Sequence, residues 1–183
     1  MRGFAVQGVE RAPGFLCHPR DKRQQIAEED LAPAMKLYTQ LAGVRKGTSV
    51  WTAIRCLVPA LENSTEEIRY LLLWVGLEAL FGANAEITHR ISQRIAFFVG
   101  KDRSEARGLY RSAKKAYEFR SKVAHGVWRT DESSTKLTGE TETLLRKALV
   151  KLLLDGEIAK PFLGKSDSRE KYLDGLVFDA LPS

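Results

Sequence analysis

The stretch STEEIRYLLLWVGLEALF, Ser64 to Phe81, decides the fold of this chain. Its opening residues, Ser64-Thr65-Glu66-Glu67, match a capping box, which marks the start of a helix. The apolar run that follows, Leu71 to Phe81, is 11 residues long and is interrupted by Gly76 and Glu78. A membrane-spanning helix needs roughly 20 apolar residues, so this run is too short to cross a bilayer. A helix that is hydrophobic on almost every side is buried, and we expect this one at the centre of a helical bundle.

Apolar residues recur at helical spacing through most of the remaining chain, without strand alternation or an internal repeat. We therefore predict an all-α fold, a single helical-bundle domain of about five to six main helices. The expected helices cover residues 21–41, 49–61, 64–81, 86–99, 102–125 and 138–154. Residues 130–136 are expected to be a polar loop and residues 1–20 an irregular arm. Residues 156–183 are expected to be a tail with short helical pieces, which leaves 21–155 as the folded domain.

The composition is that of an ordinary globular protein. Of the 183 residues, 44% are hydrophobic and 28% charged, which excludes disordered and collagen-like proteins. The two cysteines, Cys17 and Cys56, form no CxxC pair and no Cys/His set, so neither a metal site nor a redox motif is expected. The first residues contain no apolar secretion signal, and no segment is long enough to span a membrane. We expect a cytoplasmic protein with no membrane partner.

The formal net charge is +6, and its position is more informative than its size. Residues 101–129 hold nine basic and three acidic side chains, and the rest of the chain has 20 of each sign. The whole excess of positive charge therefore lies in one segment. A localised basic stripe is typical of a surface that binds nucleic acid or another polyanion, although a solvated helix face can have the same composition.

The helix expected at 102–125 has an apolar and a basic face, about 100° apart. Arg120 falls on the apolar face, where an unpaired charge is costly, so it either forms a core ion pair with Glu78 or works in a site. His125 falls at the edge of the basic face, about 140° from Arg120. The two side chains can meet where the helix ends near Gly126, or between two copies of the chain. A surface histidine near a helix C-terminus is the alternative for His125. The basic face comprises Arg103, Arg107, Arg111, Lys114 and Lys122.

The string YEFRSKVAHG, Tyr117 to Gly126, contains an arginine and a histidine with four residues between them. Together with LEALF at 77–81 and the segment Arg90 to Ala96, it resembles the HEPN superfamily, specifically the Apea-like HEPN domain, over about residues 50–155. The resemblance implies an all-α bundle that dimerises with its two Arg/His motifs facing each other. It also implies a metal-independent endoribonuclease of toxin, antiphage or RNA-processing systems. Some members lack the activity and bind RNA, a nucleotide or a protein, which is the alternative for this chain.

The resemblance also implies a role for individual residues. His125 would act as the acid/base, Arg120 would hold the scissile phosphate, and Ser121, where many members have Asn, Asp or His, would assist. The ribose 2′-OH would attack the adjacent phosphorus, giving a 2′,3′-cyclic phosphate and a 5′-OH without a metal or cofactor.

Further residues of the chain would support that site. The RNA backbone would follow a basic track, which comprises Arg107, Arg111, Lys114 and Lys122. Glu78, Arg90 and Arg94 match polar positions of the family's helices and would orient the site or pair in the core. The expected partners are RNA, a second copy of the chain and an antitoxin or defence-system protein.

Overall fold

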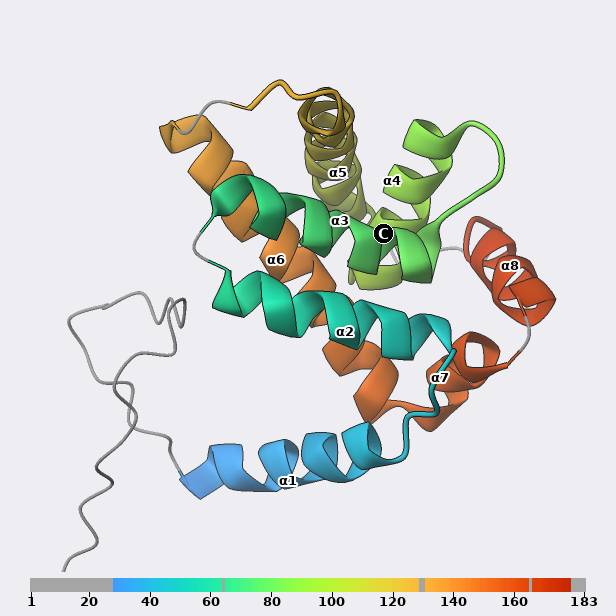
Figure 1. Cartoon of the computed structure of the whole chain (residues 1–183). Helices are drawn as coiled ribbons and strands as arrows, with labels where there is room; N and C mark the ends of the chain where they lie inside the picture. The colour runs from blue at the N-terminus through green and yellow to red at the C-terminus, as the bar shows by residue number, and fades with distance from the viewer. Residues whose placement is uncertain (1–27, 64, 129–130, 165, 179–183) are drawn as a thin grey trace, which may run out of the picture.

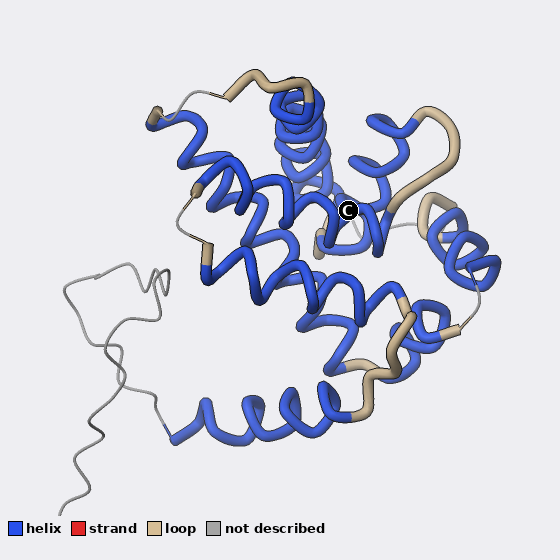
Figure 2. The backbone as a smooth tube through the Cα atoms, in the orientation of Figure 1, coloured by secondary structure: helices blue, strands red, loops and turns tan. Residues whose placement is uncertain are grey.

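The computed structural model describes residues 28–63, 65–128, 131–164 and 166–178 (Figure 1). Over these residues the chain is helical throughout, without a strand, so the all-α prediction is confirmed there (Figure 2). None of the described helices combines the length and the apolar character that a membrane crossing requires. The helices are α1 (Glu28–Ala42), α2 (Ser49–Glu62), α3 (Glu66–Phe81), α4 (Ile87–Val99), α5 (Arg103–Ala124), α6 (Glu132–Leu154), α7 (Gly156–Leu163) and α8 (Ser166–Gly175). The arm expected at 1–20 lies outside the described residues.

The prediction of five to six main helices is wrong, because the described residues form eight. The additional helices, α7 and α8, lie in the tail, where short helical pieces are expected but are not counted as main helices. Asp155 separates α6 from α7. The Asp155 carboxylate accepts hydrogen bonds from the backbone N–H groups of Glu157 and Ile158 at 3.0 and 3.2 Å. The same residue that ends one helix therefore caps the next.

The polar loop expected at 130–136 is wrong for residues 132–136, which form the first turn of α6. The Asp131 carboxylate accepts from the Ser134 backbone N–H at 2.8 Å, and the Ser134 hydroxyl accepts from the Asp131 backbone N–H at 3.0 Å. This pair is a capping box, but serine stands where glutamate or glutamine is usual. The polar residues of this segment are therefore the start of a helix.

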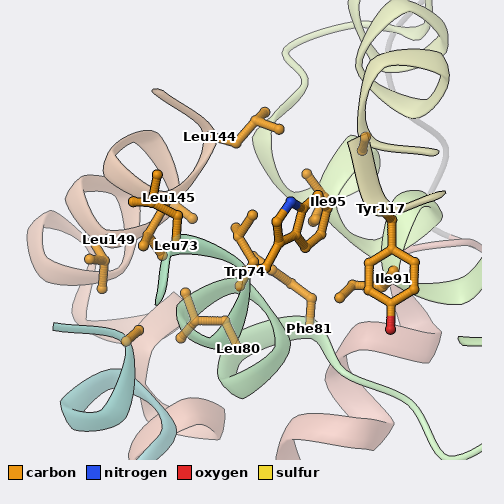
Figure 3. Packing of buried hydrophobic residues seen from close by; sticks show 14 of the residues in the cluster. Leu73, Trp74, Leu80, Phe81, Ile91, Ile95, Tyr117, Leu144, Leu145 and Leu149 are labelled. Carbon is orange, nitrogen blue, oxygen red and sulfur yellow. The ribbon is translucent and has the colours of Figure 1, made fainter. Parts of the chain in front are cut away.

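The α3 helix lies at the centre of the bundle and contacts α2, α4, α5 and α6 (Figure 1). Figure 3 shows Trp74 of α3 in the middle of the core, between Ile95 and Tyr117 on one side and Leu145 on the other. The rings of Trp74 and Tyr117 meet edge to face, with centroids 5.1 Å apart. This contact holds α5 against α3. The fully buried side chains of α3 are those of Tyr70, Leu73, Trp74, Leu77, Leu80 and Phe81.

One strip of α3 is only partly covered by the described residues. Ile68 and Val75 are 46% and 42% exposed, and Leu72 and Ala79 are half-buried. These four residues recur at helical spacing, so they form a single apolar strip along the helix. We call it the α3 apolar strip. The central helix is thus covered on most of its circumference and partly exposed along this line.

The α1 helix stands apart from the rest of the bundle, as Figure 1 shows. It packs mainly against α6, where the Lys36 ammonium donates to the backbone carbonyl of Leu154 at 3.0 Å. Its large apolar side chains are exposed; they are Leu31, Met35, Tyr38 and Leu41. The first helix therefore contributes little to the core.

Substitution of Gly76 tests the close packing of α3. A methyl group there would lie 2.8 Å from Cδ2 of Leu145, so this fully buried side chain would have to shift within the core. Gly76→Ala should lower the free energy of unfolding by about 1 to 2 kcal/mol, because overpacking outweighs the gain in helix propensity. Chemical denaturation measures this change.

Gly139→Ala in α6 is the matched control, because a methyl group at Gly139 meets no other atom within 4 Å. This control should raise the free energy of unfolding by about 0.5 to 1 kcal/mol through helix propensity alone. Equal stabilisation by both substitutions would contradict the close approach of α3 to α6.

Candidate functional site

The α5 helix presents the basic segment to solvent. Its N-cap is Asp102, whose carboxylate accepts from the Glu105 backbone N–H at 2.8 Å. The buried side of the helix is formed mostly by small residues, which let α5 pack closely on its neighbours. The opposite side carries the positive charge. Its exposed basic side chains are Arg103, Arg107, Arg111, Lys114, Lys115 and Lys122.

His125 is the residue at which α5 ends. Gly126 follows with a φ of 82°, in the left-handed region that glycine adopts easily. The N–H of Gly126 donates to the Val123 carbonyl at 2.9 Å, and the N–H of Val127 donates to the Lys122 carbonyl at 3.0 Å. This is the Schellman pattern of a helix C-terminus. The turn stops the helix directly after His125 and leaves the imidazole exposed.

The position of His125 along α5 relates it to the basic residues. His125 follows Arg107 by 18 residues, or about five turns, so the two side chains lie in register on one face of a regular helix. Lys114 lies between them within about 20° of the same line. The exposed imidazole therefore shares one face of α5 with Arg107 and Lys114, and the exposed carboxylate of Glu118 lies between Lys114 and His125 on the same face.

Arg120 lies on the other side of α5 and pairs with Glu78 of α3. Its Nη2 is 3.0 Å from Oε1 and 3.1 Å from Oε2 of Glu78. The guanidinium also lies 5.8 Å from the ring centroid of Tyr117. Burial, and then the negative charge of Glu78, raise the pKa of Tyr117 above its usual value. The core ion pair that the sequence left open for Arg120 is thus present.

The ion pair leaves part of the Arg120 guanidinium unused. The side chain is 26% exposed. Its Nε is buried and has no hydrogen-bond partner among the described residues. The contacts with Glu78 use Nη2. Glu78 therefore holds one nitrogen of a guanidinium that solvent still reaches in part.

The structure does not bring Arg120 and His125 together within one copy of the chain. The two residues lie about 140° apart around α5, and no contact joins their side chains in the described structure. Ser121 is exposed next to Lys122. A single copy thus presents the arginine and the histidine of the motif on different sides of one helix.

Arg90 and Arg94 lie elsewhere and tie α4 to α8. Arg94 is 2% exposed and donates to Glu170 at 2.7 Å and to Asp174 at 2.9 Å. It also donates to the carbonyl of Gly82 at the end of α3. Arg90 lies 3.8 Å from Asp174. Both arginines pair with acidic residues of α8, and neither contacts the motif of α5.

Sequence reasoning missed a cavity between α4, α5 and the residues that follow α8. Its volume is about 850 Å³, and Arg107, Phe97 and Phe178 are among the residues that line it. His89 of α4 and Tyr110 of α5 also line it, with 3.0 Å between Nδ1 and the phenol oxygen. Neither Tyr110 nor His89 has a role in the predictions made from the sequence. Only the packing of three separated segments reveals the cavity. We call it the α4/α5 cavity.

The chain matches no family model, no curated protein and no solved structure. Within the described ranges, no three His, Cys, Asp or Glu side chains gather in a way that could hold a metal ion. A proposal about function therefore rests on the geometry of α5 and its neighbours.

Glu78→Gln tests the ion pair that positions Arg120. The substitution keeps the shape of the side chain and removes its charge, which leaves a mostly buried guanidinium without a counter-charge. We expect the free energy of unfolding to fall by about 2 kcal/mol, the scale of a hydrogen bond to a charged group. Thermal or denaturant unfolding measures the loss.

Glu140→Gln serves as the control for this substitution. Its carboxylate lies 4.0 Å from Lys136 and its side chain is 41% exposed, so this ion pair within α6 contributes about 0.5 kcal/mol or less. If both variants lost the same small amount of stability, the pair of Arg120 and Glu78 would not be a structural contact.

Proposed function

We propose that this protein is a HEPN-type endoribonuclease that cleaves RNA without a metal ion, in a site completed by a second copy of the chain. One observation carries the proposal: an exposed imidazole, His125, lies at the end of the α5 face that bears the exposed basic residues Arg107 and Lys114. A face with excess positive charge can bind a polyanionic backbone, and the imidazole can act on a phosphate that lies beside it.

The chemistry follows from the residue types. One imidazole removes the proton of a ribose 2′-OH, and the 2′-oxygen forms a bond to the adjacent phosphorus while the bond from phosphorus to the 5′-oxygen breaks. A second imidazole, in its protonated form, donates a proton to the leaving 5′-oxygen. The products are a 2′,3′-cyclic phosphate and a 5′-OH. DNA lacks the 2′-OH and should not be cleaved.

Arg120 supplies positive charge to the phosphoryl oxygens. Glu78 holds Nη2, and in this proposal Nη1 of the partly exposed guanidinium donates to a phosphoryl oxygen. A guanidinium held in this way stabilises the charge that grows during the attack without having to reorganise. Ser121, exposed beside it, is a further donor to the phosphate in this proposal.

Two copies are needed because one copy presents Arg120 and His125 on different sides of α5. The α3 apolar strip supports self-association, since it is a partly exposed apolar surface on the helix that also carries Glu78. Pairing of two such strips about a two-fold axis would bury Ile68 and Val75 and bring in a second motif.

The cellular role is part of the same proposal. A cytoplasmic ribonuclease with few sequence requirements damages its own host, so its activity has to be restrained. This favours a toxin or antiphage-defence protein whose partner covers His125 until cleavage is needed. RNA and that protein partner would compete for the same end of α5.

A second candidate function is a HEPN module that binds RNA, a nucleotide or a protein without cleaving anything. It is favoured by the ion pair itself, because Arg120 already has a partner in Glu78. In that case the basic face of α5 binds, and the motif residues stabilise the fold.

A cleavage assay separates the two functions. Purified full chain is incubated in excess EDTA with mixed single-stranded and structured RNA, and the 3′ ends of the products are identified. Wild type should give cyclic phosphates, and His125→Ala should lose at least about 100-fold in rate while it still retains RNA, because it lacks the acid/base.

Arg120→Lys is the second variant, because lysine keeps the charge but not the planar fork. It should fold and cut at least about tenfold more slowly. Arg55→Lys, at an exposed position of α2, is its control and should cut like wild type. RNA binding without cleavage by wild type would overturn the enzyme and leave the binding module.

A further inference from the structure

The α4/α5 cavity is large enough for a small organic ligand. Its volume of about 850 Å³ lies within the range of small-molecule sites. One wall is α4 and another is the first half of α5. The remaining wall comes from Val177 and Phe178, which follow α8. The cavity is thus built by three segments that the tertiary fold brings together.

One rim of the cavity is strongly positive. Arg103, Arg107 and Arg111 line it from successive turns of α5, about 6 Å apart along the helix axis. Arg107 and Arg111 are exposed and form no ion pair with any described residue. Unpaired guanidinium groups at the mouth of a cavity favour an anionic ligand, and their forked geometry suits a phosphate.

The interior of the cavity is apolar and aromatic. Ala96 and Ala106 are buried, and Phe97 is half-buried. Phe178 is 87% exposed at the edge of the cavity. A large aromatic side chain left in water beside a cavity offers a flat face on which a flat ligand can stack.

We infer that the α4/α5 cavity holds one unpaired nucleotide of the RNA strand, with its base against Phe97 and Phe178 and its phosphate at Arg107 and Arg111. This inference rests on the proposed function and adds a second anchoring point to it. A nucleotide has a flat aromatic base, which can stack on the phenylalanine rings, and a phosphate, which can bind the arginines. An acidic peptide could bind the arginines, but it has no flat aromatic group to stack on Phe97 and Phe178.

The basic face of α5 connects the cavity to the motif. From Arg107 to His125 the helix rises about 27 Å. A stacked strand advances about 3.4 Å per nucleotide, so the anchored nucleotide lies at most about eight nucleotides from the scissile phosphate. Lys114 and Lys122 lie between the two points and contact the intervening backbone. The cavity therefore selects single-stranded RNA, because a paired base cannot enter it.

The test measures binding with a strand that cannot be cleaved. The probe is a 12-nucleotide RNA with 2′-O-methyl groups, whose capped oxygens cannot attack phosphorus, and binding is followed by fluorescence anisotropy with the full chain. An abasic strand with the same phosphates, the same RNA in a duplex, adenosine monophosphate and an Asp/Glu-rich peptide are compared as competitors.

The single strand should bind about tenfold more tightly than the abasic strand, which has no base to stack. Phe178→Ala should weaken the single strand about tenfold and leave the abasic strand unchanged. Arg107→Ala should weaken both strands and reduce the slope of log affinity against log salt by about 0.7. Tyr38→Ala, an exposed aromatic residue of α1, and Arg55→Ala are the matched controls and should bind like wild type.

Two results would overturn the inference. One is equal affinity for the abasic and the complete strand, which would leave the cavity without a base. The other is competition by the acidic peptide, or by the mononucleotide at the affinity of the whole strand, which would assign the cavity to another ligand. Weak competition by the mononucleotide supports the inference. Because the probe is not cleaved, a failure of the cavity and a failure of the ribonuclease activity are separate results.

Discussion

Burial of the α3 helix is the constraint on which the rest of the molecule depends. Its side chains are apolar on nearly every side, so the helix is stable in water only when other helices cover it. The four helices that do so, α2, α4, α5 and α6, are held in place by that contact. Trp74 meets Tyr117 and Tyr70 meets Phe119, which fixes α5 in both position and rotation. In this orientation of α5, Arg120 points toward Glu78 of α3, and the other basic side chains of α5 point into solvent.

The same packing separates two kinds of positive charge. Three arginines lie mostly inside the protein, and each forms an ion pair with a carboxylate of another helix; they are Arg69, Arg94 and Arg120. For Glu142, burial raises the pKa, but the hydrogen bonds from Arg69 and Arg146 outweigh it and hold the pKa below its usual value. Other basic residues of α5 are exposed and form no ion pair with a described residue; they are Arg107, Arg111, Lys114 and Lys122. The inner arginines join helices to one another, and the outer ones form the surface on which a polyanion can bind.

Much of the fold was accessible from sequence because local signals were strong. The apolar run predicted α3, and the angular position of Arg120 among apolar residues indicated either a core ion pair or a site. The capping box expected at the start of α3 is not formed, because its N-cap residue, Thr65, makes no side-chain capping hydrogen bond. Other features needed information that one residue pattern does not contain. Asp155 both ends and starts a helix, and Asp131 caps α6 with an unusual partner, Ser134. The α4/α5 cavity and the open strip of α3 arise from how separate helices meet. No periodicity along the chain encodes either of them.

In the proposed reaction, the ribose 2′-OH next to the scissile phosphate is the nucleophile, in a site that includes His125. Replacing one ribose by 2′-deoxyribose at a mapped cleavage position, and repeating the reaction in excess EDTA, tests this step. We expect the cut at that position to disappear, while cuts at unmodified positions continue at their former rate. Cleavage at the deoxy position at an unchanged rate, or no cleavage of the unmodified RNA, would rule the reaction out.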